Sequence, residues 1–569
     1  MLLKAYESPV ALLGGMSPFC SPGEEKSKGY EMRRKGIVFR GGLIQEIVEV
    51  GDGESGYQSA LALLRQKYGD VLNVIKLDEN CFVFPGMIDI HNHIDYNLMP
   101  IWEHPSELTR AGVDWDIRNE WRHKNCREYQ TDISGFHDFI ISYMMEKGGM
   151  SKEAVMLKLQ FFSELQAIAG GTTTLQESEG LRDGDVYYPT QHLLLRSTGV
   201  PEDLGLAKEQ AVSNVIDFFK PDIAFKTEPD DLYYPPLDTG SWTNVARDNY
   251  EKYINLLKNN SADTIRRKTG GYQVHLAEGR AGNLKAQGMD LYSKKEFETL
   301  RDAILGIPGY KEKVKASRLA IIHGCGIDLT KQENIDFIND CDIHIVWSPV
   351  SNLLLYGDTP NFIKSGIRPE LLCLGSDWAP SGSKHVWDEA AFAQLFEKKH
   401  FYNGTLPQDG FDRIFDMITK NPAASLNSEL LGGIAVGKAA DFYIVSSTRN
   451  VPAQAAAPVT FLKNIFVFND YHSVGTVVNG NLVFGTAELF KAFGTEGVSI
   501  ASDGINALNL MAYVPASLGI RFDDDLKLID DAFAAYSERQ GKTYARSCFL
   551  SSNDMAYYNR IRQLEKEFC

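Results

Sequence analysis

The stretch Phe82-Val83-Phe84-Pro85-Gly86-Met87-Ile88-Asp89-Ile90-His91-Asn92-His93 carries two histidines, one residue apart, at the end of a hydrophobic run. Side chains alternate along a β-strand, so residues i and i+2 point to the same face. We therefore expect His91 and His93 to lie on one strand and to reach one metal ion, because imidazole is a common ligand for divalent metals. Taken alone, the pair is equally compatible with two ordinary histidines near a surface.

The bulk composition describes a globular protein of more than one domain. The chain has 569 residues, of which 44% are hydrophobic and 23% charged, and this length exceeds one ordinary core. A formal net charge of -17 without a dominant basic cluster argues against nucleic acid or an anionic membrane as a partner. No run of about 20 apolar residues suggests a membrane span.

The cysteines and the first residues indicate a reducing compartment. The eight cysteines are scattered and form no CxxC pair, so neither a disulfide framework nor thiolate zinc ligation is expected. The first residues, from Met1 to Glu7, lack the long apolar stretch of a secretory signal. We therefore expect a cytoplasmic protein.

Two segments with short strand-like pieces flank the middle of the chain. Residues 1–84 contain such pieces at 36–40 and 43–48, and residues 432–487 contain them at 441–445 and 477–484. Regular short strands separated by turn residues are typical of a small β-sandwich. We predict that the two segments form the two parts of one composite β-sandwich domain.

Between them, residues 85–431 alternate strand-like and helix-like patterns, which predicts an α/β fold with a distorted (β/α)8 TIM-type barrel. Several apolar strands end in polar residues, where such barrels place their chemistry. These strands are expected at Gly171–Glu177, Gly271–His275, Leu319–His323, Ile343–Ser348 and Leu371–Asp377. Helical patterns include Glu153–Ala169 and Lys208–Phe219. Residues 488–569 form a partly helical C-terminal extension, with helices expected over Asp525–Gln540 and Asp554–Phe568, to which we assign no chemistry.

Four further residues extend the histidine pair. His275 ends a strand and is followed three residues later by Glu278, while His323 and Asp377 end later strands. Three imidazoles and one carboxylate hold a divalent metal and leave a position open for water, which loses its proton near neutral pH. Glu278 could then move a proton from water to the departing nitrogen, and His323 could donate to the developing oxyanion. Singly, each has an ordinary interpretation as a structural histidine, a loop charge or a turn cap.

With these residues in place, the chain resembles the amidohydrolase superfamily of metal-dependent hydrolases over roughly residues 36–487. The most specific motifs are Pro85–His93, His275–Glu278 and Leu374–Ser383, supported by Trp347–Gly357 and Gly433–Phe442. The resemblance implies a distorted (β/α)8 barrel with a composite β-sandwich.

The resemblance is closest to the mononuclear branch, with its deaminases and triazine hydrolases. It implies that His91, His93, His275 and Asp377 bind one divalent metal, usually zinc and sometimes iron. It also implies that Glu278 relays protons, that His323 assists, and that Asp377 orients the nucleophilic water. The binuclear branch bridges two metals with a carboxylated lysine, a role for which Lys226 is the candidate, and His323 would then be a ligand.

Substrate recognition is less clear from the sequence. Residues 95–138 form a long connection after the first barrel strand, rich in aromatic and charged residues, which fits either a lid over the site or a subunit contact. Trp378 directly follows Asp377 and could stack on a planar group. Asn352 and Ser383 are candidate polar contacts.

We therefore expect a metal-dependent amidohydrolase that hydrolyses a non-peptide C–N bond of a small molecule: an amidine, guanidine, amino-heterocycle or amide. The alternatives are a binuclear amidase or cyclic-amide hydrolase that uses Lys226, and a non-catalytic scaffold. By analogy with the family, a homodimer or larger homo-oligomer is expected.

Overall fold

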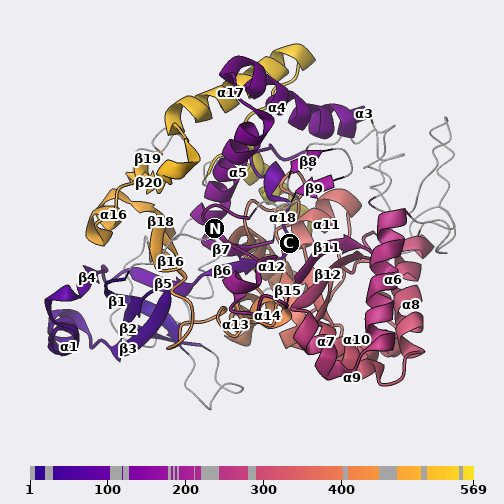
Figure 1. The fold of residues 1–569 in the computed structure, drawn as a ribbon, viewed down its shortest axis with the longest axis horizontal. Helices are drawn as coiled ribbons and strands as arrows, with labels where there is room; N and C mark the ends of the chain where they lie inside the picture. The colour runs from indigo at the N-terminus through magenta and orange to yellow at the C-terminus, as the bar shows by residue number, and fades with distance from the viewer. Residues whose placement is uncertain are drawn as a thin grey trace.

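The structure is a computed structural model. It describes residues 7–19, 30–102, 118, 127–176, 181–183, 186–188, 191–210, 212–219, 243–279, 290–401, 408–447, 471–500, 509–549 and 555–568. In Figure 1 the indigo N-terminal strands and the orange strands of residues 442–486 lie on one side of the molecule, and the parallel strands of residues 212–323 lie on the other.

The flanking segments meet in one large, mostly antiparallel sheet. Its strands from the first segment include β1 (Val10–Phe19), β2 (Glu31–Arg40), β3 (Leu43–Glu49), β4 (Asn73–Lys76) and β5 (Cys81–Pro85). From the later segment come β16 (Phe442–Ser447), β17 (Tyr471–Val478) and β18 (Asn481–Thr486). The two sets join where β5 pairs with β16, with Pro85 opposite Phe442. Whether this single sheet folds into the predicted sandwich stays a prediction.

The alternation of side chains explains why these residues form strands buried on both faces. Along β1, Val10 and Leu12 enter one hydrophobic cluster, while Ala11 and Leu13 enter another. Helix α1 (Gly53–Tyr68) covers the second face through Leu64, which is fully buried. A strand with both faces covered needs apolar residues at consecutive positions, as the sequence provides.

The middle of the chain forms two parallel sheets. One contains β6 (Met87–Asp89), β7 (Thr172–Leu175) and β10 (Arg196–Ser197). The other contains β11 (Val212–Asp217), β12 (Gly271–Leu276), β13 (Leu319–His323), β14 (His344–Trp347) and β15 (Leu372–Leu374), paired in chain order. Three and five parallel strands give the number expected of a TIM-type barrel. An isolated parallel bridge between Asn92 and Asp377 links the two sheets. Among the described residues no ladder joins β10 to β11, so the closed barrel stays a prediction.

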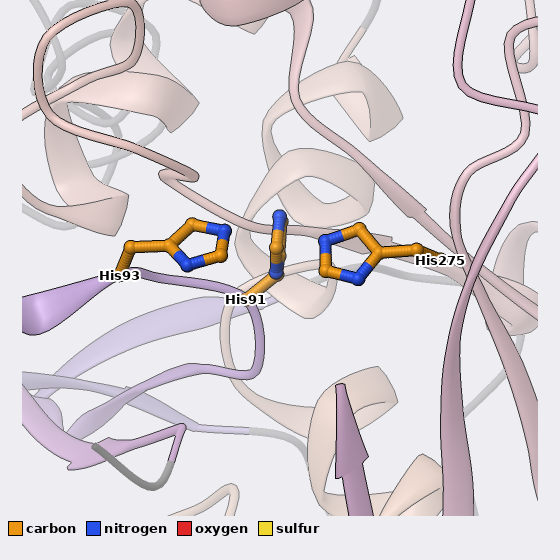
Figure 2. Close-up of side chains that lie close together, drawn as sticks. All are labelled: His91, His93 and His275. Atoms are coloured by element: carbon orange, nitrogen blue, oxygen red, sulfur yellow. The ribbon is translucent and has the colours of Figure 1, made fainter. Parts of the chain in front are cut away.

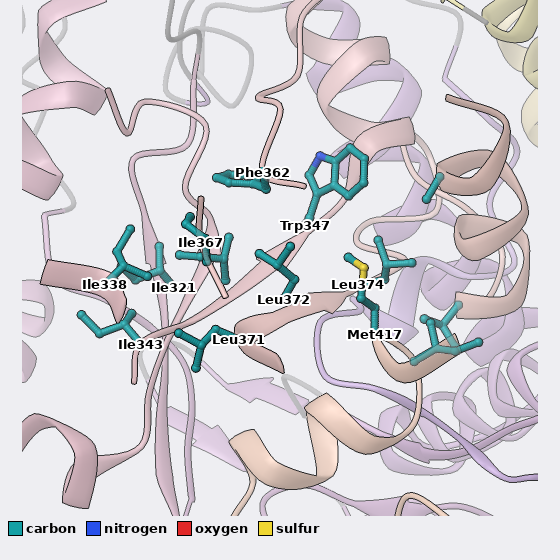
Figure 3. Packing of buried hydrophobic residues seen from close by; sticks show 14 of the residues in the cluster. Ile321, Ile338, Ile343, Trp347, Phe362, Ile367, Leu371, Leu372, Leu374 and Met417 are labelled. Carbon is teal, nitrogen blue, oxygen red and sulfur yellow. The ribbon is translucent and has the colours of Figure 1, made fainter. Parts of the chain in front are cut away.

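Helices cover the parallel strands through a continuous apolar core. All five residues of β13 are buried, and Ile321 belongs to a cluster with Trp347, Leu374 and Met417, part of which is visible in Figure 3. The predicted helix over Glu153–Ala169 is confirmed as α5 (Lys152–Ala169), whose Ser151 side chain accepts a hydrogen bond from the Ala154 amide at its first turn.

The helix predicted over Lys208–Phe219 is wrong, because this segment contains strand β11. The strand pairs with β12 and brings Asp217 opposite His275. Short apolar runs have similar periodicity in a buried strand and a buried helix, and neighbouring strands decide between them. Likewise, His91 and His93 follow β6 instead of lying on it.

The C-terminal extension contains both predicted helices. The first is α17 (Phe522–Gln540), which packs against α4 (Gly135–Gly148), as Figure 1 shows. The second is α18 (Met555–Phe568), which packs against α11 (Pro349–Tyr356) and α12 (Val386–Phe401). In the described part of the chain, no helix is both long enough and apolar enough to cross a membrane.

A buried ion pair ties the parallel strands to the large sheet, and it provides a test of this packing. Arg196 in β10 donates to Asp441 over 2.6 Å and 3.2 Å, and both side chains are buried. We expect Arg196→Ala to destabilise the protein by about 3 kcal/mol or more, because an unpaired carboxylate would remain buried. Denaturant unfolding measures this.

The matched control is Lys527→Ala, which removes an exposed pair with Asp531. We expect that variant to change stability by less than about 1 kcal/mol. Equal effects of the two substitutions would contradict a structural role for the Arg196–Asp441 pair.

Candidate metal centre and active site

The strand ends bring four histidines together. His275 lies in β12, His323 ends β13, and His91 and His93 follow β6. The ring centroid of His91 is 5.1 Å from that of His93, 4.9 Å from that of His275 and 5.0 Å from that of His323. Figure 2 shows the His91 ring between those of His93 and His275. Their spacing leaves room for one ion between the ring nitrogens.

Asp377 completes this group from the end of β15. Its Oδ1 lies 2.8 Å from Nε2 of His91 and 3.7 Å from Nε2 of His93. Potential ligand atoms lie within 4.8 Å of one another in three overlapping groups. These groups are His91–His93–His275, His91–His323–Asp377 and His275–Glu278–His323. The six residues singled out in the sequence therefore converge on one place.

Backbone hydrogen bonds hold the two ligand segments together. The Asp377 amide donates to the His91 carbonyl over 2.9 Å, and the His93 amide donates to the Asp377 carbonyl over 3.4 Å. Gly375 allows the close approach, because a Cβ at this position would lie 2.7 Å from Cβ of His91. Such a distance is shorter than van der Waals contact permits.

Two of the proposed functional residues adopt strained backbone conformations. His323 has φ 69° and Asp377 has φ 61°, in the left-handed region that non-glycine residues seldom occupy. Such conformations cost about 1–3 kcal/mol each and concentrate at functional sites. The fold holds both residues there through the surrounding strands.

Burial and charge keep the donor atoms in the forms that bind metals. Burial lowers the pKa of the His275 and His323 imidazoles, and the remaining histidines add to the effect at His275. Burial alone would raise the pKa of Asp377, but the neighbouring His323 and His91 outweigh it and hold that pKa below its usual range. Neutral imidazoles beside a carboxylate are the ligand forms that a divalent cation needs.

The orientation of His91 fits a metal ligand. Its Nδ1 lies 3.0 Å from Oε1 of Gln176, which also accepts from the Asn92 amide. Its Nε2 is buried and lies 2.8 Å from Oδ1 of Asp377 without forming a hydrogen bond, among the residues that the structure describes. Metal-binding histidines commonly use one nitrogen for the ion and the other for such a partner. The residues present therefore suit a divalent metal.

Glu278 is held by its own set of donors beside this group. Tyr356 donates to Oε1 over 2.8 Å, and Arg118 donates to Oε2 over 3.2 Å. The same Oε2 lies 3.7 Å from Nε2 of His323. The side chain is 9% exposed, so the alternative of a solvated loop charge does not describe it.

A small pocket of about 50 Å³ opens onto these groups. Trp378 lines it together with Tyr96 and Tyr129, which gives one wall an aromatic character. The lining also includes His93, His275, Glu278, Leu355, His323, Asp377 and Ser381.

The other two predicted substrate contacts are not in this lining. Asn352 is buried and donates to Oγ1 of Thr359 over 3.2 Å. Ser383 is buried and donates to Glu389. Contact of either residue with a substrate stays a prediction.

Four residues around the site carry contacts that sequence reasoning did not assign. Gln176 follows β7, Asp217 ends β11, Tyr356 ends α11, and Arg118 comes from the long connection 95–138. The sequence feature that could have identified Gln176 and Asp217 is a polar residue at the end of a parallel strand. Nothing local to Tyr356 distinguished it, and Arg118 stood out only as one of the charged residues of the long connection 95–138. Lys226, the candidate bridging lysine, lies outside the described residues.

Comparison with known families agrees with this site. The amidohydrolase family model matches residues 292–483, a range that includes His323 and Asp377. This match confirms the predicted relationship to the amidohydrolase superfamily. It also confirms the enzyme class, a hydrolase acting on carbon–nitrogen bonds other than peptide bonds. No curated protein matched the chain.

Several solved structures resemble the chain at low sequence identity. A guanine deaminase from C. acetobutylicum with bound guanine has 16% identity and a TM-score of 0.44, covering 83% of this chain and 99% of its own. A zinc-bound adenosine deaminase from Xanthomonas campestris has 13% identity and a TM-score of 0.49, covering 93% and 99%. A variant of atrazine chlorohydrolase from Arthrobacter aurescens TC1 with zinc and atraton has 14% identity and a TM-score of 0.46, covering 85% and 98%. Because each TM-score lies below 0.5, none of these likenesses establishes a substrate for this chain.

The contact at Gly375 provides a test of the site's assembly. We expect Gly375→Ala to push the segment of His91 away from that of Asp377, which destabilises the protein by about 1–3 kcal/mol and lowers bound metal. Unfolding and metal analysis of the same preparation measure both effects.

Gly433→Ala is the matched control, because its added methyl group would lie 3.6 Å from the side chain of Lys438, at ordinary van der Waals distance. If Gly375→Ala bound metal as the wild type does, the close approach would not matter to the site.

Proposed function

We propose that this chain is a mononuclear metal-dependent amidohydrolase that hydrolyses a non-peptide C–N bond at a planar carbon of a small molecule. The carbon would belong to an amidine, guanidine, amino-heterocycle or amide, with loss of ammonia or an amine. One observation carries the proposal: four histidines, Asp377 and Glu278 converge at the end of the parallel strands.

The proposed ligands are His91, His93, His275 and Asp377, and the expected metal is zinc, with iron as the alternative. When bound there, the ion would lower the pKa of water and polarise the substrate. Asp377 remains a carboxylate because its pKa lies below the usual range, so its oxygens can accept a hydrogen bond from the attacking water. This acceptance orients the water toward the planar carbon.

Glu278 is proposed as the group that moves the proton. It would accept a proton from the water and give it to the departing nitrogen. Its Oε2 lies 3.7 Å from Nε2 of His323, so the two side chains face the same reacting atoms. His323 would donate a hydrogen bond to the oxygen on which negative charge develops.

The pocket supports a small and at least partly planar substrate. Trp378, Tyr96 and Tyr129 offer aromatic surfaces beside the reacting groups, and such surfaces pack well against flat heterocycles. We propose a small-molecule substrate and no nucleic-acid or membrane partner, in keeping with the charge of -17. We also propose a cytoplasmic location and a homodimer or larger homo-oligomer.

A binuclear amidase that uses a carboxylated Lys226 is the second candidate. One observation favours it: the ligand atoms of His323 also lie within 4.8 Å of those of His91 and Asp377, as a second metal ligand would require. Two metal equivalents per chain and a carbamate on Lys226 would establish this alternative.

Metal content distinguishes the two candidates. We expect one divalent ion per chain, retained through dialysis and removed by a chelator. Removal should lower the unfolding temperature, because an ion that binds only the folded state stabilises it. His275→Ala should reduce bound metal strongly, because only three of the four proposed ligands would remain.

His472→Ala is the control for loss of a histidine, because His472 is exposed on β17. Elemental analysis of all three proteins measures the outcome. A wild-type protein that folds normally but binds no divalent metal would refute the proposal.

Glu278→Gln tests the chemistry. After a screen for ammonia release from amidines, guanidines and amino-heterocycles, we expect this variant to keep its metal and to turn over about 10²–10⁴-fold more slowly. Glu298→Gln, which alters a carboxylate that pairs with Lys331 away from the site, should retain full activity. Full activity in Glu278→Gln would end the assignment of Glu278 as the proton carrier.

A further inference from the structure

Arg118 inserts a guanidinium group beside the proposed metal centre. It comes from the long connection between β6 and α3 (Arg127–Tyr129), and the residue is 8% exposed. Its Nη1 donates to Oε2 of Glu278 over 3.2 Å, and its Nη2 donates to Oδ1 of Asp217. One side chain therefore binds two carboxylates at the ends of the neighbouring strands β11 and β12.

Both carboxylates border the reacting groups. Glu278 is the proposed proton carrier, and Oδ1 of Asp217 lies 3.8 Å from Nδ1 of His275. This distance is too long for a hydrogen bond, but Asp217 also lies opposite His275 in the ladder between β11 and β12. Arg118 therefore contacts one proposed functional residue, Glu278, and a neighbour of another, His275, without lying among the residues that line the pocket.

The geometry suits arginine in particular. The guanidinium is planar and presents its donors in a fixed fork, so two carboxylates can be bound at a set spacing and angle. Tyr356 donates to the other oxygen of Glu278. The two oxygens of this carboxylate are thus held from two directions, and the side chain has little freedom to rotate.

The local charges require a cation at this point. Glu278 and Asp217 both pair with Arg118, while nearby Glu296, whose pKa burial raises to about 8, accepts a hydrogen bond from the Ala277 amide over 2.7 Å. Carboxylates this close repel one another in a poorly solvated site. Arg118 offsets that repulsion, so its loss would allow the carboxylates to move apart.

We propose that Arg118 is a positioning residue that fixes the proton carrier Glu278 relative to His275 by bridging Glu278 and Asp217. The kinetic consequence rests on the function proposed above, whereas the structural consequence does not. A residue that only anchored its own loop would leave Glu278 in place when removed.

Crystal structures of the wild type, Arg118→Ala and Arg118→Lys test the structural consequence without any substrate. We expect Glu278 to leave its wild-type position in Arg118→Ala. Lysine keeps the charge but has a single nitrogen, so in Arg118→Lys we expect one carboxylate to stay bound and the other to be released. Both carboxylates in their wild-type positions in either variant would overturn the proposal.

Kinetics with a substrate from the ammonia-release screen test the consequence for turnover. We expect Arg118→Ala to lower kcat about 10²-fold, the scale of a misplaced catalytic group, with metal content unchanged and KM altered by less than about 3-fold. Arg118→Lys should recover part of kcat. A change in KM alone, or no change, would contradict the proposal.

Arg301→Ala is the matched control, because this arginine is largely buried and pairs with Asp302 away from the site. We expect it to keep the wild-type kcat. A wild-type protein without hydrolase activity would refute the proposed function, and the position of Glu278 in the variant crystals would still decide the role of Arg118.

Discussion

The site depends on one short backbone contact, the parallel bridge between the segment of His91 and His93 and the segment of Asp377. Its two hydrogen bonds set the distance between proposed ligands from opposite ends of the barrel sequence. Buried polar side chains reinforce it: Asn92 donates to Oγ of Ser376, and the Ser376 amide donates to Asp89 over 3.1 Å. Burial raises the pKa of Asp89 to about 6, so near neutral pH it remains an acceptor. Among the residues that the structure describes, the bridge also joins the two parallel sheets.

The remaining ligands follow from this contact and from the parallel sheet. His275 and His323 lie on neighbouring strands, with Leu276 opposite His323 in the ladder. Parallel strands bring their carboxyl ends to the same edge, so residues far apart in the chain become neighbours. Asp377 follows β15 at the same edge of the sheet. The β12–β13 ladder and the Asn92–Asp377 bridge therefore determine the relative positions of the histidine rings. The hydrogen bonds of the ladder and of the bridge hold His323 and Asp377 in their strained backbone conformations.

The sequence predicted the groups that converge at the candidate site but not the groups that hold them. His275, Glu278, His323 and Asp377 were found because each follows an apolar run at a recognisable strand end. His91 and His93 were found because alternating residues of a strand point to the same face. Both residues in fact follow β6, and the backbone bridge between Asn92 and Asp377 holds their segment in place instead. The strand β11 was mistaken for a helix, which hid Asp217. Arg118 and Tyr356 reach the site by tertiary folding, and no local spacing could indicate that.

The C-terminal extension, to which the sequence assigned no chemistry, supports the aromatic wall of the pocket. Lys542 and Tyr544 both donate to Asp132, which also accepts from the indole of Trp102 over 3.3 Å. The Trp102 ring packs edge-on against Trp378 at 6.1 Å, and Trp378 lines the pocket. A buried carboxylate with several donors holds its partners more rigidly than apolar contact alone, because each unmade hydrogen bond would leave a buried polar group unsatisfied. The end of the chain thus fixes the surface that a planar substrate would contact, at a distance from the metal centre itself.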